Sequence, residues 1–343
     1  MRTADARSLA RGKMALMVGA LAAALLLGEA VPADAQSRQP TPIRVGRIAG
    51  GDGFHIPSYV AVEKGHFLQE GLKPTLVAME GGALVKATIA KELDFVPIPG
   101  GGSQAMLQGA PLVFVVGESL ISQWTLTTTP DIRKVEDMRG KTIGLGRPGS
   151  ADYEELVIVL AKFFKMKLGT DYKVIAFRSE PDRLAALFRG SIQGAALSFP
   201  HAARAEVEGL KVLVRTGDHI PRLGGTFHTH KDNVTQRRDT VKAFVKAIAR
   251  GIDFIRTNRD GTVSVIQKYF AMDDRRVAES VYRVLYDKYS PEIPHDLLVK
   301  LFESRAIPEL GWPAGKPLPD VEQFVARGLL SEALADLGKK PVR

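Results

Sequence analysis

Residues 43–215 repeat one order of apolar strand patterns and amphipathic helix patterns, and the second copy follows the first by 99 positions. In this register residues 75–79 fall on 174–178, and residues 92–94 fall on 191–193. Alternating strands and helices predict parallel sheets that carry helices on both faces. Because the element order and the turn positions persist through the repeat, we expect two similar three-layer α/β lobes.

The repeat predicts four strands in each copy. They cover 43–48, 75–79, 95–98 and 112–116 in the first copy and 142–145, 173–177, 195–198 and 212–214 in the second. The chain crosses between the copies at 119–129 and again at 224–232, and two crossings suit a hinge motion. We therefore divide the chain into a first lobe, residues 43–122 and 231–337, and a second lobe, residues 123–230 including the hinge strands.

The remainder of the chain has a helical pattern. Residues 240–258 place their apolar side chains on one face at helical spacing, and Asp239 or Thr240 is the expected N-cap. An apolar helix face needs a surface to cover. We expect this helical C-terminal region to pack on the first lobe.

Two facing lobes form a cleft. Ligands of open parallel sheets bind at the carboxyl ends of the strands, where glycines allow close approach and helix N-termini favour anions. The loops at these positions provide the candidate residues. We expect ligand contacts from Asp52, Phe54, His55, Gly82, Gly101, Gly102, Ser103, Trp124, Gly149, Ser150, Phe199, His201 and Thr226.

The first 35 residues differ in composition from the rest. Basic residues precede an apolar run from Met14 to Leu27, and Ala33-Asp34-Ala35 follows as an A-x-A cleavage site. This order predicts a secretory signal peptide, residues 1–35, that is cut after Ala35. The chain has no cysteine, so it has neither disulfides nor a lipoprotein anchor site. We expect a soluble periplasmic protein.

The formal net charge is +9, and the Lys and Arg residues are dispersed along the chain. A nucleic-acid interface needs a clustered basic patch, so none is expected. The dispersed charge gives only a mild attraction for anions.

Three segments carry a family resemblance. Residues 61–72 read AVEKGHFLQEGL, residues 137–144 read DMRGKTIG, and residues 241–255 form a helix of the type V-x-x-F-x-x-A. In these motifs the chain resembles periplasmic substrate-binding proteins of ABC importers, in the branch that binds nitrate, alkanesulfonates, taurine or thiamine-pyrimidine precursors. The resemblance spans about residues 40–330 and implies a type II periplasmic binding protein fold, a small-molecule ligand, and an ABC permease and ATPase as partners. Glu92 and Gln193 depart from the family pattern.

Two enzyme classes compete with this interpretation. Ser103 lies on a near G-x-S-x-G motif, which is typical of a hydrolase nucleophile, but Pro97 and Pro99 remove two donors from the strand that would carry it. Gly144-x-Gly146-x-x-Gly149 fits a dinucleotide fingerprint, yet Pro148 stands where the helix of that motif begins. The family resemblance includes a thiamine-pyrimidine synthase with a cysteine-rich iron site, and this chain has no cysteine.

Metal binding is a further alternative, because His228 and His230 have the spacing of residues on one strand face. We expect no metal and no cofactor. The sequence predicts a monomeric binding protein, not an enzyme. It captures a small polar molecule, anionic or aromatic, and delivers it to an ABC-type permease. A secreted serine hydrolase using Ser103 and a ligand-sensing module are the alternatives.

Overall fold

The structure, a computed structural model, describes residues 39–339 except 50 and 307. The predicted signal peptide, residues 1–35, lies outside the described residues. Among the described residues, no helix combines the length and the apolar character needed to cross a membrane.

A five-stranded sheet with the strand order β6-β5-β7-β4-β8 is formed by residues 124–215. β5, β6 and β7 run parallel, whereas β4 is antiparallel to both of its neighbours. The strand bounds are β4 Trp124–Thr128, β5 Thr142–Leu145, β6 Lys173–Ala176, β7 Gly194–Ser198 and β8 Lys211–Arg215. Three helices connect these strands, α6 Ala151–Phe164, α7 Glu180–Phe188 and α8 Phe199–Val207.

Helices cover both faces of this sheet. Ala196 of β7 belongs to the hydrophobic cluster that contains Leu156 and Val159 of α6. Its neighbour Leu197 belongs to a second cluster with Leu184 of α7. Successive side chains of a strand point to opposite faces, so the two clusters are the two sides of one three-layer arrangement.

The other strands form two pairs. β1 Thr41–Ile48 pairs in parallel with β2 Leu72–Met79, and β3 Leu112–Ile121 pairs antiparallel with β9 Pro221–His230. Phe95 and Val96 join the pairs, because Phe95 bridges to Val45 of β1 and Val96 bridges to His228 of β9. The resulting order, β2-β1-(95–96)-β9-β3, repeats the order of the five-stranded sheet.

The predicted strand at 95–98 is only partly correct. Regular pairing is confined to Phe95 and Val96, and helix α5, Pro99–Leu107, begins three residues later. Pro97 has no N–H to donate to a sheet ladder, which accounts for the early end of the strand. β4 was not predicted as a strand, since residues 119–129 were interpreted only as a crossing.

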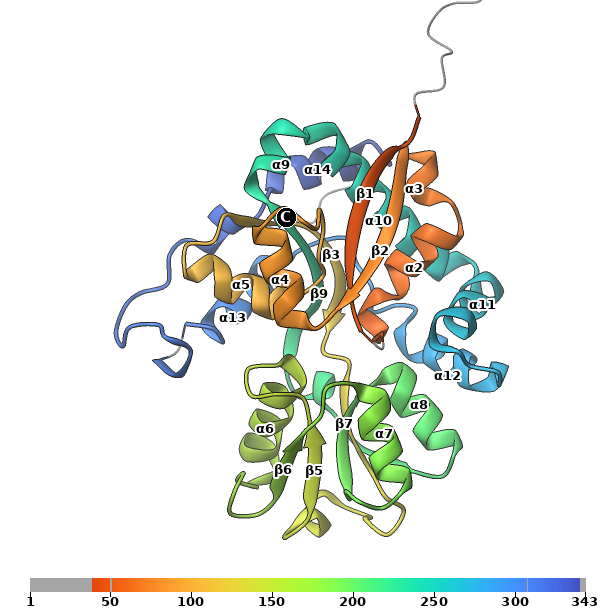
Figure 1. Cartoon of the computed structure of the whole chain (residues 1–343), viewed down its shortest axis with the longest axis vertical. Coiled ribbons are helices and arrows are strands. Elements are labelled where there is room, and N and C mark those ends of the chain that lie inside the picture. The colour runs from red at the N-terminus through yellow and green to blue at the C-terminus, as the bar shows by residue number, and fades with distance from the viewer. Residues whose placement is uncertain (1–38, 50, 307, 340–343) are drawn as a thin grey trace, which may run out of the picture. The chain divides into compact units, whose positions relative to one another are not determined.

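Helices cover both sides of the β1–β2 pair as well (Figure 1). Leu84 of α4 packs with Val96 on one side, whereas Phe95 stacks on Phe244 of α10 on the other, with ring centroids 3.7 Å apart. The helices of this part are α2 Ile56–Glu63, α3 His66–Gln69, α4 Gly81–Ile89, α9 Lys231–Gln236, α10 Arg238–Thr257, α11 Arg259–Phe270, α12 Arg275–Leu285, α13 His295–Glu303 and α14 Arg327–Ala335.

The predicted C-terminal helix is present, and its apolar face is buried, from Val241 to Ile255. Its predicted start is wrong. The helix begins at Arg238 with Arg237 as N-cap, so Asp239 lies in the first turn and not at the cap. Short 3-10 helices complete the fold, η2 Gly53–His55, η3 Val135–Met138, η4 Thr216–Asp218, η5 Pro308–Leu310 and η6 Val321–Phe324.

The chain passes between the two sheets twice. β3 ends at Ile121 and β4 begins at Trp124, and the return runs from η4 into β9. Each crossing thus supplies the antiparallel strand of the sheet that it enters. The predicted lobe boundaries after residues 122 and 230 stay predictions, and β9 pairs with β3 of the first lobe.

Candidate functional site

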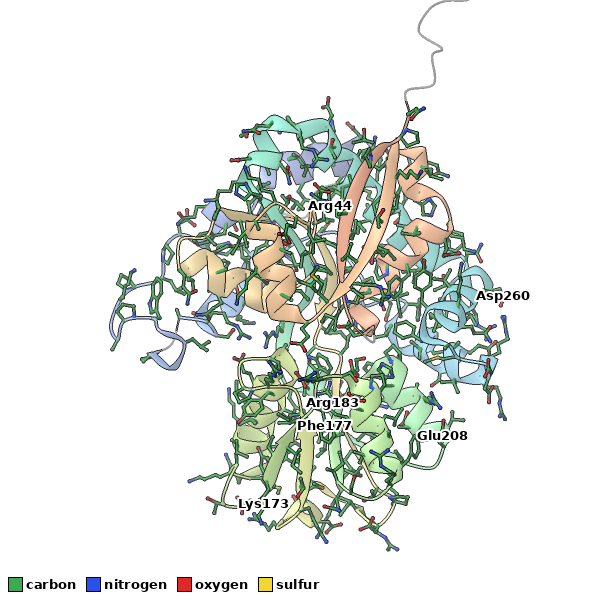
Figure 2. All side chains as sticks on the ribbon, viewed as in Figure 1. Arg44, Lys173, Phe177, Arg183, Glu208 and Asp260 are labelled. Carbon is green, nitrogen blue, oxygen red and sulfur yellow. The ribbon has the colours of Figure 1, made fainter. Side chains whose placement is uncertain are left out.

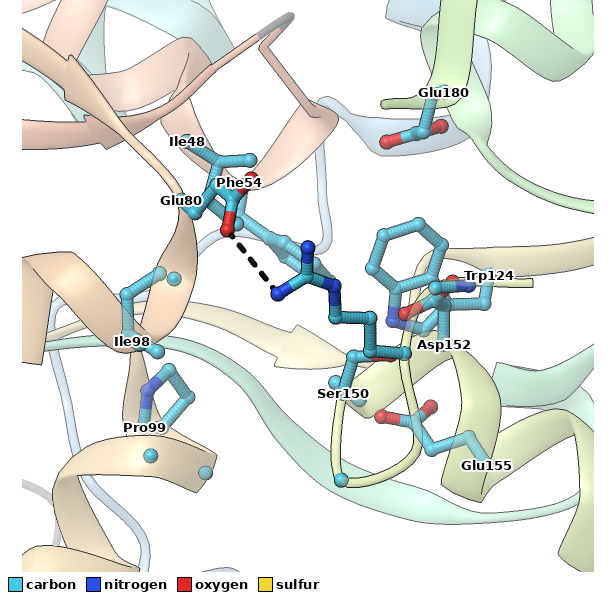
Figure 3. A pocket seen from close by; sticks show the side chains of 18 of the residues that line it. Ile48, Phe54, Glu80, Ile98, Pro99, Trp124, Ser150, Asp152, Glu155 and Glu180 are labelled. Carbon is cyan, nitrogen blue, oxygen red and sulfur yellow. Dashed lines mark hydrogen bonds and ion pairs between the residues drawn. The ribbon is translucent and has the colours of Figure 1, made fainter. Parts of the chain in front are cut away.

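A cavity of about 460 Å³ lies at the carboxyl ends of β1, β2, β5 and β6. This is within the range of roughly 300–1,000 Å³ that is typical of small-molecule sites. Its walls include the starts of α4, α5, α6 and α7, the first residue of β4, and Arg222, Leu223 and Gly224 of β9 (Figure 3). Figure 2 shows the polarity of the five-stranded sheet, with Lys173 at the far end and Phe177 and Arg183 toward the cavity.

Six of the thirteen predicted site residues line this cavity. They are Phe54, Gly82, Gly101, Trp124, Gly149 and Ser150. Five of the six lie on loops or helix starts that the repeat had placed on the cleft, and the sixth, Trp124, lies in the first crossing as the first residue of β4. Their contacts with a ligand stay a prediction. Ser150 is the N-cap of α6, yet its Oγ has no hydrogen-bond partner among the described residues.

Asp52 and His55 lie outside the lining and are buried. Asp52 caps η2 by accepting a hydrogen bond from the N–H of Phe54 at 2.9 Å. His55 accepts the N–H of Ile48 on Nε2 at 3.0 Å, so it ties the end of β1 to the following turn. Burial lowers the pKa of His55 to about 3. Both residues are therefore buried and stabilise the first loop through these hydrogen bonds, and neither lines the cavity.

Gly102 and Ser103 are also outside the lining. Because α5 begins at Pro99, Ser103 lies within the helix and does not cap it. Its hydroxyl is fully buried and donates to the carbonyl of Gly100 at 3.0 Å. A Cβ on Gly102 would lie 2.8 Å from the ring of His228, so this glycine serves close packing. The arrangement does not favour the serine hydrolase.

Phe199, His201 and Thr226 face other neighbours. The guanidinium of Arg215 lies over the Phe199 ring, and the His201 ring meets Phe270 edge-on at 6.3 Å. Thr226 is buried on β9, where its hydroxyl donates to the carbonyl of Gly225. His228 and His230 have separate surroundings too: His228 is fully buried, and His230 accepts the N–H of Asp232.

An aromatic corner forms one side of the cavity. Phe54 and Trp124 meet edge to face, with centroids 6.0 Å apart. The indole N–H of Trp124 is buried and finds no acceptor in the described part of the chain. An apolar ligand body gains burial against these rings, and the indole offers one directed donor.

Two carboxylates hold the loops of the five-stranded sheet in place. Asp152 accepts the N–H of Gly146 at 2.6 Å and pairs with Arg183, and both side chains are almost fully buried. Glu180 accepts the N–H of Ser198 at 2.5 Å. Both carboxylates, which lie in the first turns of α6 and α7, therefore already accept hydrogen bonds from protein donors.

Arginines line the cavity from several directions. Arg222 of β9 pairs with Glu155 of α6 at 2.8 Å, and Arg305, which follows α13, pairs with Glu154 of the same helix. Burial raises the pKa of Glu154, an effect that Arg305 partly offsets. The exposed Arg147 reaches Glu80 at 3.9 Å, the ion pair drawn in Figure 3.

Sequence reasoning missed most of these charges. The lining contains five arginines and four carboxylates, so its charge is nearly balanced, and the net charge of the chain says little about the site. Asp152 and Glu155 could have been predicted from the sequence, because residues three apart in a helix that follows a glycine-rich loop share one helix face. Arg222 and Arg305 had none, since no motif connects them with the loops.

The architecture places the protein in a known structural class, the periplasmic binding protein fold. The alkanesulfonate-binding protein SsuA from Xanthomonas axonopodis pv. citri, bound to MOPS, has a TM-score of 0.68 and 18% identity, and the match covers 84% of this chain and 99% of that one. The nitrate-binding protein NrtA from Synechocystis PCC 6803 has a TM-score of 0.68 and 12% identity, with 87% and 89% covered.

Residues 53–261 match the family described as NMT1/THI5 like. The chain belongs to this family. No curated protein matches the chain in a sequence search. These findings confirm the resemblance to nitrate- and sulfonate-type binding proteins. Sequence identities below 20% to the solved structures are evidence for the fold alone. Structures of the same fold include an enzyme, the desulfurization enzyme DSZB, with a TM-score of 0.62 and 14% identity over 87% of this chain and 99% of that one.

Proposed function

We propose that the chain is an extracytoplasmic solute-binding protein that captures a small polar anion with an apolar or aromatic body. In this proposal the protein is secreted, is released into the periplasm after cleavage following Ala35, and acts as a monomer. It delivers its ligand to an ABC-type permease and ATPase. It performs no catalysis.

One observation carries the proposal. A cavity of ligand size is built from helix-start loops of both sheets, and only two chain crossings join those sheets in the described residues. Loops on two facing walls enclose a ligand, and a pair of crossings permits the walls to separate and close. The alkanesulfonate- and nitrate-binding proteins named above share the fold.

The chemistry of the lining supports a polar ligand with an apolar part. Phe54 and Trp124 provide apolar surface, and the arginines provide donors in fork geometry. Guanidinium groups bind carboxylate and sulfonate oxygens in pairs. A ligand with an anionic head and a compact apolar body matches both features.

Thermal unfolding of the purified chain in the presence of alkanesulfonates, nitrate, aromatic carboxylates and pyrimidines tests the proposal. A compound present at 100 times its Kd stabilises the native state by about 2.7 kcal/mol, which raises Tm by several degrees. Calorimetry then measures Kd for each compound that raises Tm. If no compound of any class raises Tm, solute capture is refuted.

Cavity-filling variants test whether the ligand binds in this cavity. A Cβ on Gly82 has open space within the lining, so Gly82→Phe should weaken binding. Gly328→Phe adds the same side chain at an equally open position of α14 outside the lining and should leave Kd unchanged.

A further inference from the structure

The first turn of α5 offers unpaired backbone donors to the cavity. Pro99 is its first residue, no side chain caps it, and Gly100 and Gly101 both line the cavity. The first N–H groups of a helix have no intrahelical acceptor, and the N–H of Gly102 already bonds to Ile98. Among the residues that the structure describes, the N–H groups of Gly100 and Gly101 have no acceptor and can therefore meet an anion, and the helix dipole favours negative charge there.

Arg305 brings a second, independent set of donors to the same place. Its side chain is 4% exposed, and a Cβ on Gly100 would lie 3.2 Å from its Nη2. Nη1 pairs with Glu154, whereas Nε and Nη2 have no acceptor within the described ranges. These two nitrogens form one edge of the guanidinium, the edge that binds two oxygens of a carboxylate or sulfonate.

Arg222 completes the arrangement. Its Nη1 pairs with Glu155, and its Nη2 would lie 3.4 Å from the same Cβ on Gly100. Two buried guanidiniums therefore approach one helix N-terminus, and in the part of the chain that the structure describes each pairs with a single carboxylate. Burial, together with the charge of Arg222, lowers the pKa of Arg305. Donors that are buried without acceptors cost stability, and a bound oxyanion relieves that cost.

We propose that the N-terminus of α5, Arg305 and Arg222 form the subsite for the anionic head group of the ligand, a carboxylate or a sulfonate. This subsite rests on the proposed function of the cavity. The head group meets the exposed Gly101 first and then the buried Arg222, which also lines the cavity. It engages the Nε–Nη2 edge of Arg305 when α6, which holds both arginines through Glu154 and Glu155, moves relative to α5.

The apolar body of the ligand then points toward the aromatic corner of Phe54 and Trp124. Figure 3 shows Pro99, the first residue of α5, on the opposite side of the cavity from Trp124 and Glu155. The ligand class is therefore an organic acid whose anionic head group and apolar body bind at opposite sides of the cavity. A bare inorganic anion would occupy only the head-group side.

Matched pairs of probes test the subsite by calorimetry. Benzoate and benzenesulfonate carry the head group, and benzamide and benzenesulfonamide are their neutral counterparts. The wild-type chain should bind at least one anion about 10- to 100-fold more tightly than its neutral counterpart, the ratio expected for charge-assisted hydrogen bonds. The two acids distinguish a planar carboxylate from a tetrahedral sulfonate.

Two variants remove the subsite by different means. Arg305→Gln deletes the fork, and Gly100→Ala inserts a methyl group against both Nη2 atoms while the charge is unchanged. Each should abolish most of the preference for the anion and leave binding of the neutral probe intact. Arg276→Gln, at an arginine that is 83% exposed and is not among the lining residues, is the charge-matched control. Unliganded Tm and circular dichroism report folding, and Gly100→Ala carries the test if Arg305→Gln fails to fold.

The outcomes separate the subsite from the function. Equal affinity for anionic and neutral probes, or a preference that survives both variants, overturns the subsite but leaves solute capture standing. If no probe and no compound of the wider panel binds, both proposals are overturned.

Discussion

Acid should destabilise the protein through His228, whose ring is fully buried on β9. Burial lowers the pKa of His228 from 6.5 to about 3. Neither ring nitrogen has a hydrogen-bond partner within the described residues, so the folded protein offers nothing that stabilises the imidazolium.

The sign follows from proton binding in the two states. Above pH 6.5 the imidazole is neutral in both states, and it contributes no pH dependence. Below pH 6.5 the unfolded chain takes up a proton that folded His228 refuses, so the free energy of unfolding falls as the pH falls toward 3. One pKa unit corresponds to about 1.36 kcal/mol. pH 5 lies about 1.5 units below the pKa of this histidine in the unfolded chain. At that pH, protonation of the histidine therefore stabilises the unfolded state by about 2 kcal/mol relative to the folded state.

Urea unfolding at pH 7.5 and at pH 5 measures this contribution. His228→Gln removes the titrating group, so the difference in unfolding free energy between the two pH values should shrink by about 2 kcal/mol. If His228→Gln and the wild type lose equal stability between pH 7.5 and pH 5, the reasoning is refuted.

Two further predictions concern buried groups near the crossings. Burial, and to a lesser extent the carboxyl of Asp52, raises the pKa of Glu118 well above its ordinary value. Folded Glu118 therefore keeps its proton to a higher pH than the same residue in the unfolded chain. As a result, the free energy of unfolding falls as the pH rises above the ordinary glutamate range. Glu118→Gln should raise Tm at pH 7.5 and flatten this dependence in calorimetric scans; an unchanged Tm and slope would contradict the assignment. A Cβ on Gly224 would lie 1.9 Å from the carbonyl oxygen of Ile121, so Gly224→Ala should cost several kcal/mol in urea unfolding, on the order of an overpacked core (~1–3) or more. Gly328→Ala has open space in α14 and should be neutral or stabilising by up to about 1 kcal/mol, and equal effects of the two substitutions would argue against the steric account.

The periodicity of the sequence was enough to predict the lobes. Strand and helix patterns are local, so β5 was predicted with its observed bounds and α10 within two residues of its start. The repeat also placed the loops of the cavity correctly, because the carboxyl ends of parallel strands share one edge of a sheet. β4 was missed because its pairing is antiparallel and comes from a crossing, which the repeat does not encode.

Side-chain direction was harder to predict than loop position. Ser103 and Phe54 both follow strand ends, yet Ser103 is buried inside α5 and Phe54 lines the cavity. The difference arises because the helix begins at Pro99, four residues before Ser103. The hydroxyl of Ser103 therefore donates to the carbonyl of Gly100 within the helix. Phe199 was expected on the cleft, but α8 carries its ring into the main hydrophobic core.

The amino-acid sequence by itself determined the two α/β lobes, the glycine-rich loops that line the cavity, and the family, because each of these depends on local periodicity and short motifs. Only the tertiary structure decided which charges enter the cavity. Arg305 comes from the segment after α13 and Arg222 from the start of strand β9, and they meet at Gly100 and at α6. Segments so distant in sequence come together through packing of the whole core, and no local pattern records that approach.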